Sequence, residues 1–257
     1  MDLMIEELSI NAWPALKTVV YDGWIIRLAE GFAHRANSVS PVYPSKINLD
    51  EKIRFCEKLY SGYNIPVSFK LVKFPGSKDH INAADAEHRL LEEKLEKLNY
   101  KRINETSIQT GFIKDIVKSS PRGVVIQNTF TSEWMEKVLE LNNTEVKYVP
   151  VFKGILGNIA VDKIVAHKEI NGEIAGVGCG VVERGYAGIF DIIVKEEYRR
   201  QGYAQEIVEA ILMEAGNRGA DKTYLQVMMD NAAALKLYKK MGYNESYRYW
   251  YRKRSLT

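Results

Sequence analysis

The second half of the chain alternates apolar runs of strand length with amphipathic runs of helix length. Runs rich in β-branched and aromatic residues predict strands at 122–130, 164–170, 173–183, 188–194, 221–229 and 245–253. Apolar residues at helical spacing predict helices at 133–142, 206–215 and 231–243. The segment 146–159 is expected to be irregular, although it is too apolar to be only a linker. This order predicts one α/β unit with antiparallel strands first and a parallel crossover later.

Local signals mark the ends of these elements. Thr131 or Ser132 can cap the helix at 133–142. The pair Asn171–Gly172 predicts a tight hairpin turn, and Gly242 is suited to end the last helix.

The first half resembles a shortened copy of the same order. Strands are predicted at 23–31, 34–43, 65–72 and 101–113, and helices at 48–60 and 86–100. The ends of two helices also align, KLEKLNYK (94–101) with LYKKMGYN (237–244), which pairs Leu95 with Tyr238, Asn99 with Gly242 and Tyr100 with Tyr243. A short polar stretch near Lys118–Pro121 predicts the boundary, and hence two domains, 1–118 and 119–257.

Composition and charge exclude several classes of protein. The 257 residues carry a net charge of +3, which is too mild to favour a nucleic-acid or membrane partner. The sequence holds no apolar run near the roughly 20 residues that span a bilayer. The start, MDLMIEELSI, lacks the basic region of a signal peptide. We therefore expect a cytoplasmic protein, a monomer or a homodimer.

The cysteines and histidines, which most often form disulfides or bind metals, show no pattern that predicts such a site. Cys56 and Cys179 lie far apart in regular segments, so we expect buried, reduced thiols. His80 and His88 share a neighbourhood with acidic residues, but the spacing is not that of a zinc site. We expect surface histidines and no metal.

The bend YRRQGYAQ (198–205), between a strand and a helix, holds more charge than a turn requires. A helix N-terminus exposes backbone N–H groups and a partial positive charge. Gly202 lets a ligand approach the backbone, and Arg199 and Arg200 can add charge-assisted hydrogen bonds. Together these predict a pyrophosphate cradle. A plain surface turn with solvated arginines is the alternative.

Two motifs carry a family resemblance. The stretch VKEEYRRQGYAQEIVEAIL resembles the Arg/Gln-x-x-Gly-x-Gly/Ala motif of the GNAT acyl-CoA N-acyltransferases. The stretch NAAALKLYKKMGYNE resembles a later helix of that family, which ends in Gly-Tyr or Gly-Phe. The resemblance covers roughly residues 121–257. It implies a GNAT α/β fold, with a complete C-terminal copy and a degenerate N-terminal one.

The resemblance also implies a cosubstrate, acetyl-CoA, and the residues that bind it. Its pyrophosphate would lie on the backbone of the bend, its pantetheine arm beside the strand end, and its sulfur near Tyr238. The implied binding residues are Ile192, Ile193, Val194, Arg199, Arg200, Gln201, Gly202, Tyr203, Ala204, Gln205, Asn231 and Tyr238.

Amide formation from a thioester needs a neutral amine and a proton for the leaving thiolate. Tyr238 is the candidate general acid, and the alternative is a core aromatic residue. Asp191 shares the predicted strand face of Ala187 and Ile189, so it is the candidate base or water relay, or a structural hydrogen-bonding residue. Glu183 is the second candidate base. The predicted reaction is direct transfer to a small-molecule or peptide amine, and a non-catalytic acyl-CoA sensor or scaffold is the alternative.

Two further patterns have simpler explanations. GVGCG (176–180) is followed by a strand rather than a helix, so it is not a dinucleotide fingerprint, and its glycines are expected to permit close packing. The tail YRYWYRKR (247–254) mixes rings and arginines, but it alternates as an ordinary strand does. The acceptor is expected between the halves, along 146–159 and the last strand, with Trp24, Arg35 and Asn37 contributing.

Overall fold

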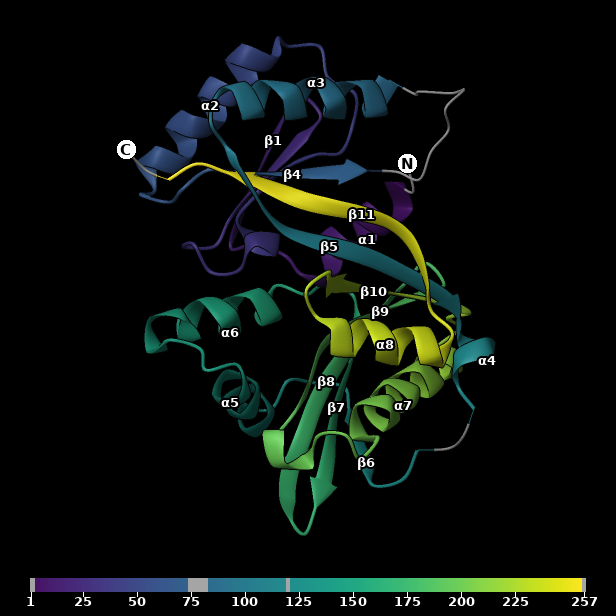
Figure 1. Cartoon of the computed structure of the whole chain (residues 1–257). Coiled ribbons are helices and arrows are strands. Elements are labelled where there is room, and N and C mark those ends of the chain that lie inside the picture. Colours follow the sequence, from purple (N-terminus) through teal and green to yellow (C-terminus); the bar gives the residue numbers. More distant parts are fainter. Residues whose placement is uncertain (1–2, 74–82, 119–120, 256–257) are drawn as a thin grey trace. The chain divides into compact units, whose positions relative to one another are not determined.

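The computed structural model describes residues 3–73, 83–118 and 121–255 (Figure 1). The chain is a mixed α/β protein that divides into two compact units. Unit 1 comprises Met1–Ser107 and Ser246–Thr257, and unit 2 comprises Ile108–Glu245. The C-terminal strand thus belongs to unit 1, although the chain reaches it from unit 2.

Unit 1 is a sheet with helices on both faces. Its elements are α1 (Leu3–Ala12), β1 (Lys17–Tyr21), β2 (Trp24–Leu28), η1 (His34–Ala36), β3 (Val39–Pro41), α2 (Leu49–Gly62), β4 (Ser68–Lys73), α3 (Ala83–Lys97), β5 (Lys101–Phe112) and β11 (Asn244–Lys253). The strand order is β1-β2-β3-β4-β11-β5. In Figure 1, α2 and α3 lie above β4 and β11, and α1 lies below them.

The two faces of the unit 1 sheet differ in chemistry. Alternate residues of β2 and β4, such as Trp24, Ile26 and Phe69, form an apolar core with α2 and α3. The residues between them face α1, and several are polar and buried. The face toward α2 and α3 is therefore apolar, whereas the face toward α1 combines buried polar groups with apolar residues of α1 such as Ile5 and Leu8.

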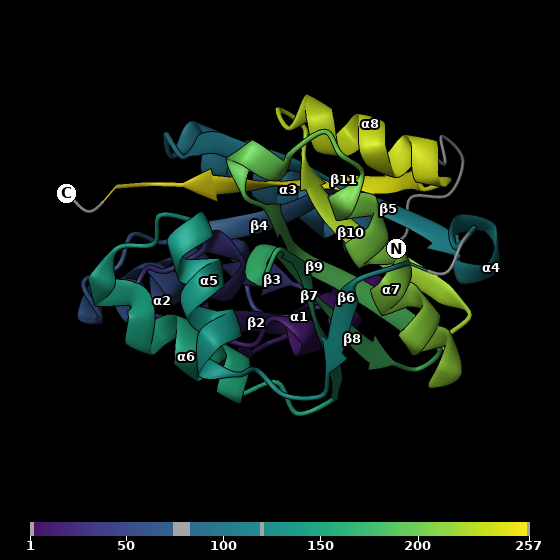
Figure 2. The same cartoon turned by 90° about the horizontal axis from the view of Figure 1, so that it is seen from below.

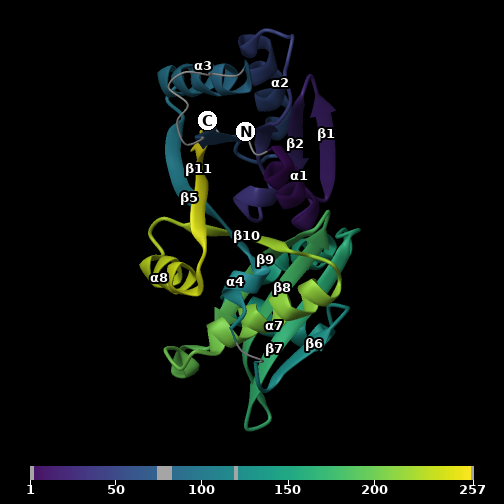
Figure 3. The same cartoon turned by 90° about the vertical axis from the view of Figure 1, so that its right-hand side faces the viewer.

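Unit 2 is built around a strongly paired antiparallel sheet. Its elements are α4 (Ile113–Ile116), β6 (Val124–Gln127), α5 (Ser132–Leu141), η2 (Val146–Tyr148), α6 (Val149–Gly157), β7 (Asp162–Ile170), β8 (Glu173–Glu183), β9 (Tyr186–Val194), η3 (Glu196–Tyr198), α7 (Tyr203–Asn217), β10 (Lys222–Met228) and α8 (Ala232–Met241). The strand order is β10-β9-β8-β7-β6, and β9 and β10 are parallel. Helix α7 lies across β7, β8 and β9 (Figure 3), and α5 packs against the opposite face of β8 and β9 (Figure 2).

Several predicted local signals are confirmed. The Asn171–Gly172 turn joins β7 to β8, and both of its residues have positive φ. Thr131 caps α5 by accepting from the Trp134 amide at 3.2 Å. Gly242, with φ of 106°, ends α8.

The predicted repeat is also visible in the backbone. Asn99 follows α3 with φ of 61°, the counterpart of Gly242 after α8. The Tyr100 amide donates to the Leu95 carbonyl at 2.9 Å, and the Tyr243 amide donates to the Tyr238 carbonyl at 3.0 Å. The two helices therefore end in the same left-handed turn.

The segment 146–159 is not irregular, because most of it forms α6. Pro150 lies in the first turn of this helix, where a missing N–H costs nothing, so this proline is compatible with the helix. The predicted strand 34–43 is reduced to the short β3 after η1. Helix α1 and strand β1 were not predicted.

The glycines of β8 permit close packing, as predicted. A Cβ on Gly178 would lie 2.5 Å from Ile192 and 2.7 Å from Ile207, and one on Gly180 would lie 2.4 Å from Ile211. Only glycine therefore lets α7 lie this close to the sheet.

Cys56 and Cys179 are both buried, as expected, and neither forms a disulfide within the described residues. His88 is not a surface residue, since it is 5% exposed and its Nε2 lies 2.9 Å from the Pro41 carbonyl oxygen. His80 lies outside the described residues. Within the described ranges, the structure holds no group of acidic, histidine and cysteine side chains able to bind a metal, and no helix long and apolar enough to cross a membrane.

Candidate active site

Strands β9 and β10 separate at one end. Their parallel pairing runs from Tyr186 opposite Lys222 to Ile189 opposite Leu225. Both strands continue beyond this point, β9 to Val194 and β10 to Met228, but no pairing between them is seen there in the described chain. The edge of β9 at residues 190–194 thus adjoins a gap in the ladder, where backbone groups can bind an extended ligand.

A bulge in β9 places Asp191 at the start of this edge. Opposite β8, Val177 pairs with Ile193 and Cys179 pairs with Phe190, so β9 holds one residue more than β8 between these pairs. Asp191 has φ of 50°, which is uncommon for a residue with a side chain.

The bulge changes which side chains face α7. The sequence predicted that Asp191 shares a face with Ala187 and Ile189, and the structure contradicts this. Ile192 and Val194 continue that face and pack with α7, whereas Asp191 is the half-buried bulge residue. Strict alternation fails because a bulge reverses the side-chain direction. The direction of the Asp191 side chain, the candidate base, therefore depends on the bulge.

The bend before α7 is held in an unusual backbone conformation. Arg200 has φ of 62°, and Gly202, the residue before the first turn of α7, has φ of 91°. A left-handed residue with a side chain costs about 1–2 kcal/mol, so the bend is strained at Arg200. Such strain is concentrated at functional sites.

The N-terminus of α7 is open. Gly202 has no side chain to cap the amides of the first turn, and a Cβ at this position would meet no atom within 4 Å. The residues Arg199–Gly202 are exposed, and Tyr203–Gln205 are half-buried. Open amides, a helix dipole and free space beside Gly202 fit the pyrophosphate of an acyl-CoA.

Arg199 and Gln201 are oriented by the backbone around the bend. Arg199 donates from Nε to the Val194 carbonyl at 3.1 Å, which links the bend to the end of β9. Gln201 donates to the Glu197 carbonyl at 3.3 Å. Arg199 thus connects the two predicted binding segments, the strand edge and the bend.

Lysines neutralise the carboxylates near the bend. Lys168 of β7 is buried, and its Nζ lies 2.7 Å from Glu206 in the first turn of α7. Lys195 contacts Glu173 at 2.6 Å and Glu197 at 3.1 Å, and these hydrogen bonds raise the pKa of the ammonium. Glu173, Glu197 and Glu206 are therefore paired, which weakens their repulsion of an anionic ligand.

Tyr238 lies in the core of unit 2. Its side chain is 8% exposed and meets the Tyr243 ring edge to face, with centroids 5.7 Å apart. Burial raises the pKa of the Tyr238 phenol to about 12, so the hydroxyl keeps its proton at neutral pH. The structure is consistent with both interpretations of the sequence, a core aromatic residue and a proton donor.

Two other predicted residues have structural contacts. Asn231 caps α8 through Oδ1, which accepts from the Ala234 amide at 3.1 Å. Glu183, at the end of β8, lies 3.2 Å from the Arg184 guanidinium. The capping contact accounts for Oδ1 of Asn231, and its amide group remains the candidate contact to pantetheine.

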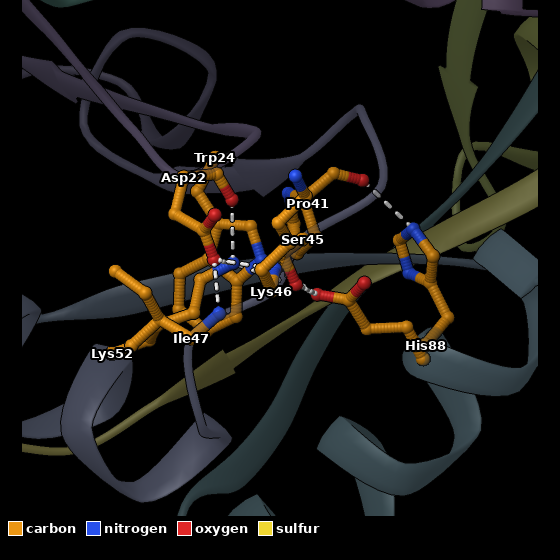
Figure 4. A network of polar contacts seen from close by, with 9 residues as sticks. Asp22, Trp24, Pro41, Ser45, Lys46, Ile47, Lys52 and His88 are labelled. Carbon is orange, nitrogen blue, oxygen red and sulfur yellow. Dashed lines mark hydrogen bonds and ion pairs between the residues drawn. The ribbon is translucent and has the colours of Figure 1, made fainter.

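The corresponding bend of unit 1 is closed by the protein itself (Figure 4). Oδ2 of Asp22 accepts from the backbone amides of Lys46 at 2.9 Å and Ile47 at 2.7 Å, just before α2. Asn48 then caps α2 by accepting from the Asp50 amide at 2.8 Å. These side chains take up the donors that a ligand anion would otherwise use.

Lys52 completes this closed arrangement. Its side chain has no exposed surface, and its Nζ lies 3.3 Å from Asp22 and 3.7 Å from Glu87. The Lys52 ammonium also lies 4.1 Å from the centroid of the Trp24 ring. The buried Lys52 ammonium is thereby paired by carboxylates of the chain itself.

Trp24, Arg35 and Asn37, the expected contributors to acceptor binding, have internal contacts. Trp24 is completely buried and donates from its indole to Glu87 at 3.0 Å. Asn37 is 3% exposed and accepts from the Ala29 and Gly31 amides. Arg35 lies 4.5 Å from the centroid of the Trp13 ring. Burial removes Trp24 and Asn37 from contact with an acceptor.

Known proteins share the sequence features of unit 2. Residues 129–243 match the model of the Acetyltransferase (GNAT) family. An uncharacterized N-acetyltransferase of Bacillus subtilis, YobR, is 25% identical over 96% of this chain and 96% of its own length. The ribosomal protein bS18 alanine N-acetyltransferase of Escherichia coli is 36% identical over 30% of this chain and 51% of its own length.

Solved structures share the fold. A GCN5-related N-acetyltransferase from Kribbella flavida has a TM-score of 0.66 at 13% identity, covering 99% of this chain and 95% of that chain. A tandem GNAT protein from the clavulanic acid biosynthesis pathway has a TM-score of 0.59 at 14% identity, covering 86% and 76%. Residues 129–243 of this chain thus match the Acetyltransferase (GNAT) family in sequence, within a fold that the chain shares with tandem GNAT proteins.

Proposed function

We propose that this protein is an acetyl-CoA-dependent N-acetyltransferase that acts on a primary amine by direct attack in a ternary complex. The observation that carries the proposal is the open N-terminus of α7, next to the separated ends of β9 and β10. A phosphate cradle and an unpaired strand edge are the two features that an extended acyl-CoA requires. The family of residues 129–243 supports the same reaction.

The cosubstrate would bind to unit 2. The amides of Arg200–Gln205 would hold its pyrophosphate, and the backbone of Ile192, Ile193 and Val194 would hold its pantetheine amides. The positive φ at Gly202 and the free space beside it support this assignment. In unit 1 the corresponding donors are already bonded to Asp22, which argues for cosubstrate binding by unit 2 alone.

The pKa of the acceptor amine determines the free energy needed to deprotonate it, and hence how important a base is. A lysine-like amine with a pKa near 10.4 needs about 4–5 kcal/mol to become neutral at pH 7, whereas an α-amine with a pKa near 8 needs about 1 kcal/mol. A base such as Asp191, directly or through water, is therefore more important for a lysine-like acceptor. Glu183 is the second candidate for this role.

In the reaction, the acceptor nitrogen would form a bond to the acetyl carbonyl carbon as the carbon–sulfur bond breaks. A backbone N–H at the edge of β9 would stabilise the oxyanion. Tyr238 would donate a hydrogen bond to the leaving sulfur. Full proton transfer from a phenol of pKa about 12 to a thiolate of pKa about 8.5 is uphill by about 5 kcal/mol. Tyr238 therefore acts mainly by hydrogen bonding, and the proton released by the acceptor nitrogen neutralises the thiolate.

The relatives' names support an amine acceptor. One acetylates the alanine of ribosomal protein bS18. Another, N-alpha-acetyltransferase 30 of Schizosaccharomyces pombe, is 38% identical over 28% of this chain and 48% of its own length. We therefore propose a small-molecule or peptide primary amine as the acceptor class.

The test combines binding and turnover. Acetyl-CoA is expected to raise the melting temperature of the full chain, and a panel of small amines and peptides is expected to identify acceptors that release free CoA. Binding of acetyl-CoA without CoA release on any amine would favour a sensor or scaffold over an enzyme. If acetyl-CoA neither binds nor stabilises the protein, the proposed function is wrong.

A further inference from the structure

A second polar cluster lies in unit 1, on the sheet face that α1 covers. Strand register brings its members together. Arg27 donates from its amide to the Ser38 carbonyl at 3.2 Å, so β2 and β3 place these residues side by side. Val39 pairs in parallel with Phe69, which puts Ser38 beside Ser68.

The next row of the same face continues the cluster. Ser40 follows Ser38 by two residues and therefore shares its face. The parallel register puts Ser40 beside Lys70, and Lys70 pairs with Tyr251 of β11. Cross-strand neighbours on one face have Cβ atoms about 4.5–5.5 Å apart, so these residues form one contiguous surface.

The cluster is enclosed but incompletely hydrogen-bonded. Arg27 is 3% exposed, and the three serines are 2% exposed or less. Within the described part of the chain, Arg27 Nε and the hydroxyl oxygens of Ser38, Ser40 and Ser68 have no hydrogen-bond partner. Buried polar groups normally have partners, so this concentration at adjacent positions points to a ligand.

The enclosed charges do not balance. Lys70 is paired with Glu6 at 2.7 Å, and the Tyr247 hydroxyl also donates to Glu6 at 2.7 Å. Among the described residues, the Arg27 guanidinium makes one hydrogen bond, a long one of 3.4 Å from Nη1 to the Trp13 carbonyl. Two buried cations thus face one buried carboxylate, and the half-buried Arg35 adds a further positive charge nearby, so the net enclosed charge is positive.

The surrounding groups would donate to an anion rather than compete with it. Burial raises the pKa of Tyr251 well above its usual value, so its hydroxyl stays protonated. Ser9 of α1 contributes a further buried hydroxyl without a partner in the described chain. Two further residues nearby add no negative charge. The His34 and Tyr251 ring centroids lie 5.1 Å apart, and the Arg35 guanidinium lies over the Trp13 ring.

We propose that this face of unit 1 binds a small carboxylate through Arg27 and the hydroxyls of Ser38, Ser40 and Ser68. A small monoanion would match the charge of the Arg27 guanidinium, which has no carboxylate partner in the described part of the chain. A guanidinium binds a planar carboxylate through two N–H groups, and serine hydroxyls donate to the remaining lone pairs. The site is separate from the proposed acetyl-CoA site and does not depend on it.

The test measures the melting temperature of the full chain against sodium acetate and sodium formate, with sodium chloride at equal ionic strength as reference. A carboxylate is expected to raise the melting temperature with the logarithm of its concentration, by about 5 °C at roughly twentyfold its dissociation constant. Arg27→Met keeps the length of the side chain and removes the charge, so this variant should lose the rise. Arg254→Met, which changes a half-buried arginine of the same unit that is paired with Glu57, should keep it.

A milder variant covers the case in which Arg27→Met fails to fold. Ser68→Ala should weaken the apparent affinity for acetate roughly tenfold and leave the protein folded. A crystal structure with acetate should show the carboxylate on Arg27. Equal responses to acetate and chloride, or a cluster filled by water alone in acetate crystals, would overturn the proposal.

Discussion

Replacing Gly202 by alanine separates the two explanations of the bend before α7. If the glycine only makes the turn, the substitution should lower stability and nothing else. If the bend cradles a pyrophosphate, the same substitution should also weaken acetyl-CoA binding. The structure lets the two effects be distinguished, because a Cβ at Gly202 meets no protein atom within 4 Å.

The expected cost in stability follows from the backbone. Gly202 has φ of 91°, and a side chain in the left-handed region costs about 1–2 kcal/mol. No steric cost inside the protein adds to this value. Relief of the strain would rotate the first amides of α7, and the methyl group would enter the space beside them. Loss of one good charge-assisted contact corresponds to about 1.4 kcal/mol, or tenfold in affinity.

The other end of α7 provides a matched control. Gly219 has φ of 88°, and a Cβ there also meets no atom within 4 Å. Gly219→Ala should therefore lower the free energy of unfolding by the same amount. Since Gly219 follows the C-terminus of α7, far along the helix from the bend, acetyl-CoA affinity should not change.

Both variants and the parent are compared in two measurements. Denaturant unfolding gives the free energy of unfolding, and calorimetry gives the affinity for acetyl-CoA. We expect similar losses of stability in the two variants, and a roughly tenfold weaker affinity in Gly202→Ala alone. Equal affinities in the two variants would refute the cradle and favour a plain turn. A loss of affinity in both variants would show that general destabilisation of the protein, rather than a change at the bend, weakens acetyl-CoA binding.

Three further predictions concern side chains. Tyr238→Phe should lower turnover roughly a hundredfold with unchanged acetyl-CoA affinity, and unchanged turnover would leave Tyr238 as a core residue. Asp191→Asn should lower turnover and shift the acidic limb of the pH profile, so an unchanged profile would remove Asp191 from the mechanism. In unit 1, the Ile47 and Lys46 amides and Lys52 hold the pKa of Asp22 below its usual value. A lowered pKa stabilises the folded state above the unfolded pKa of about 4 and loses this contribution as pH falls through the folded pKa. Asp22→Asn should therefore lower the melting temperature at pH 7, and the difference from the parent should vanish in acid.

Much of unit 2 could be predicted from the sequence because its signals are local. A hairpin turn such as Asn171–Gly172, a cap such as Thr131 and a C-terminal Gly242 each fix an element within a few residues. The direction of Asp191 could not be predicted, because it depends on one extra residue opposite β8. Helix α6 was not predicted, although its Pro150 lies in the first turn, where proline is compatible with a helix.

Pairing of distant segments was the other source of error. The buried position of His88 depends on Pro41, and that of Trp24 on Glu87. No local pattern indicates these partners. The assignment of the C-terminal strand to unit 1 has the same cause, since β11 pairs with β4 in the folded protein.

The two halves show how one bend can be used in two ways. Before α2, Asp22 and Asn48 satisfy the free donors, and Asp50 and Glu51 lie in the first turn. A carboxylate supplied by the chain is always present, so this arrangement stabilises the fold without a ligand. Before α7, the chain leaves the equivalent donors open, strains Arg200 and places glycine at the start of the helix. A protein that needed only the turn could have closed it as unit 1 does, and the open form is best explained by an anion that comes from outside the chain.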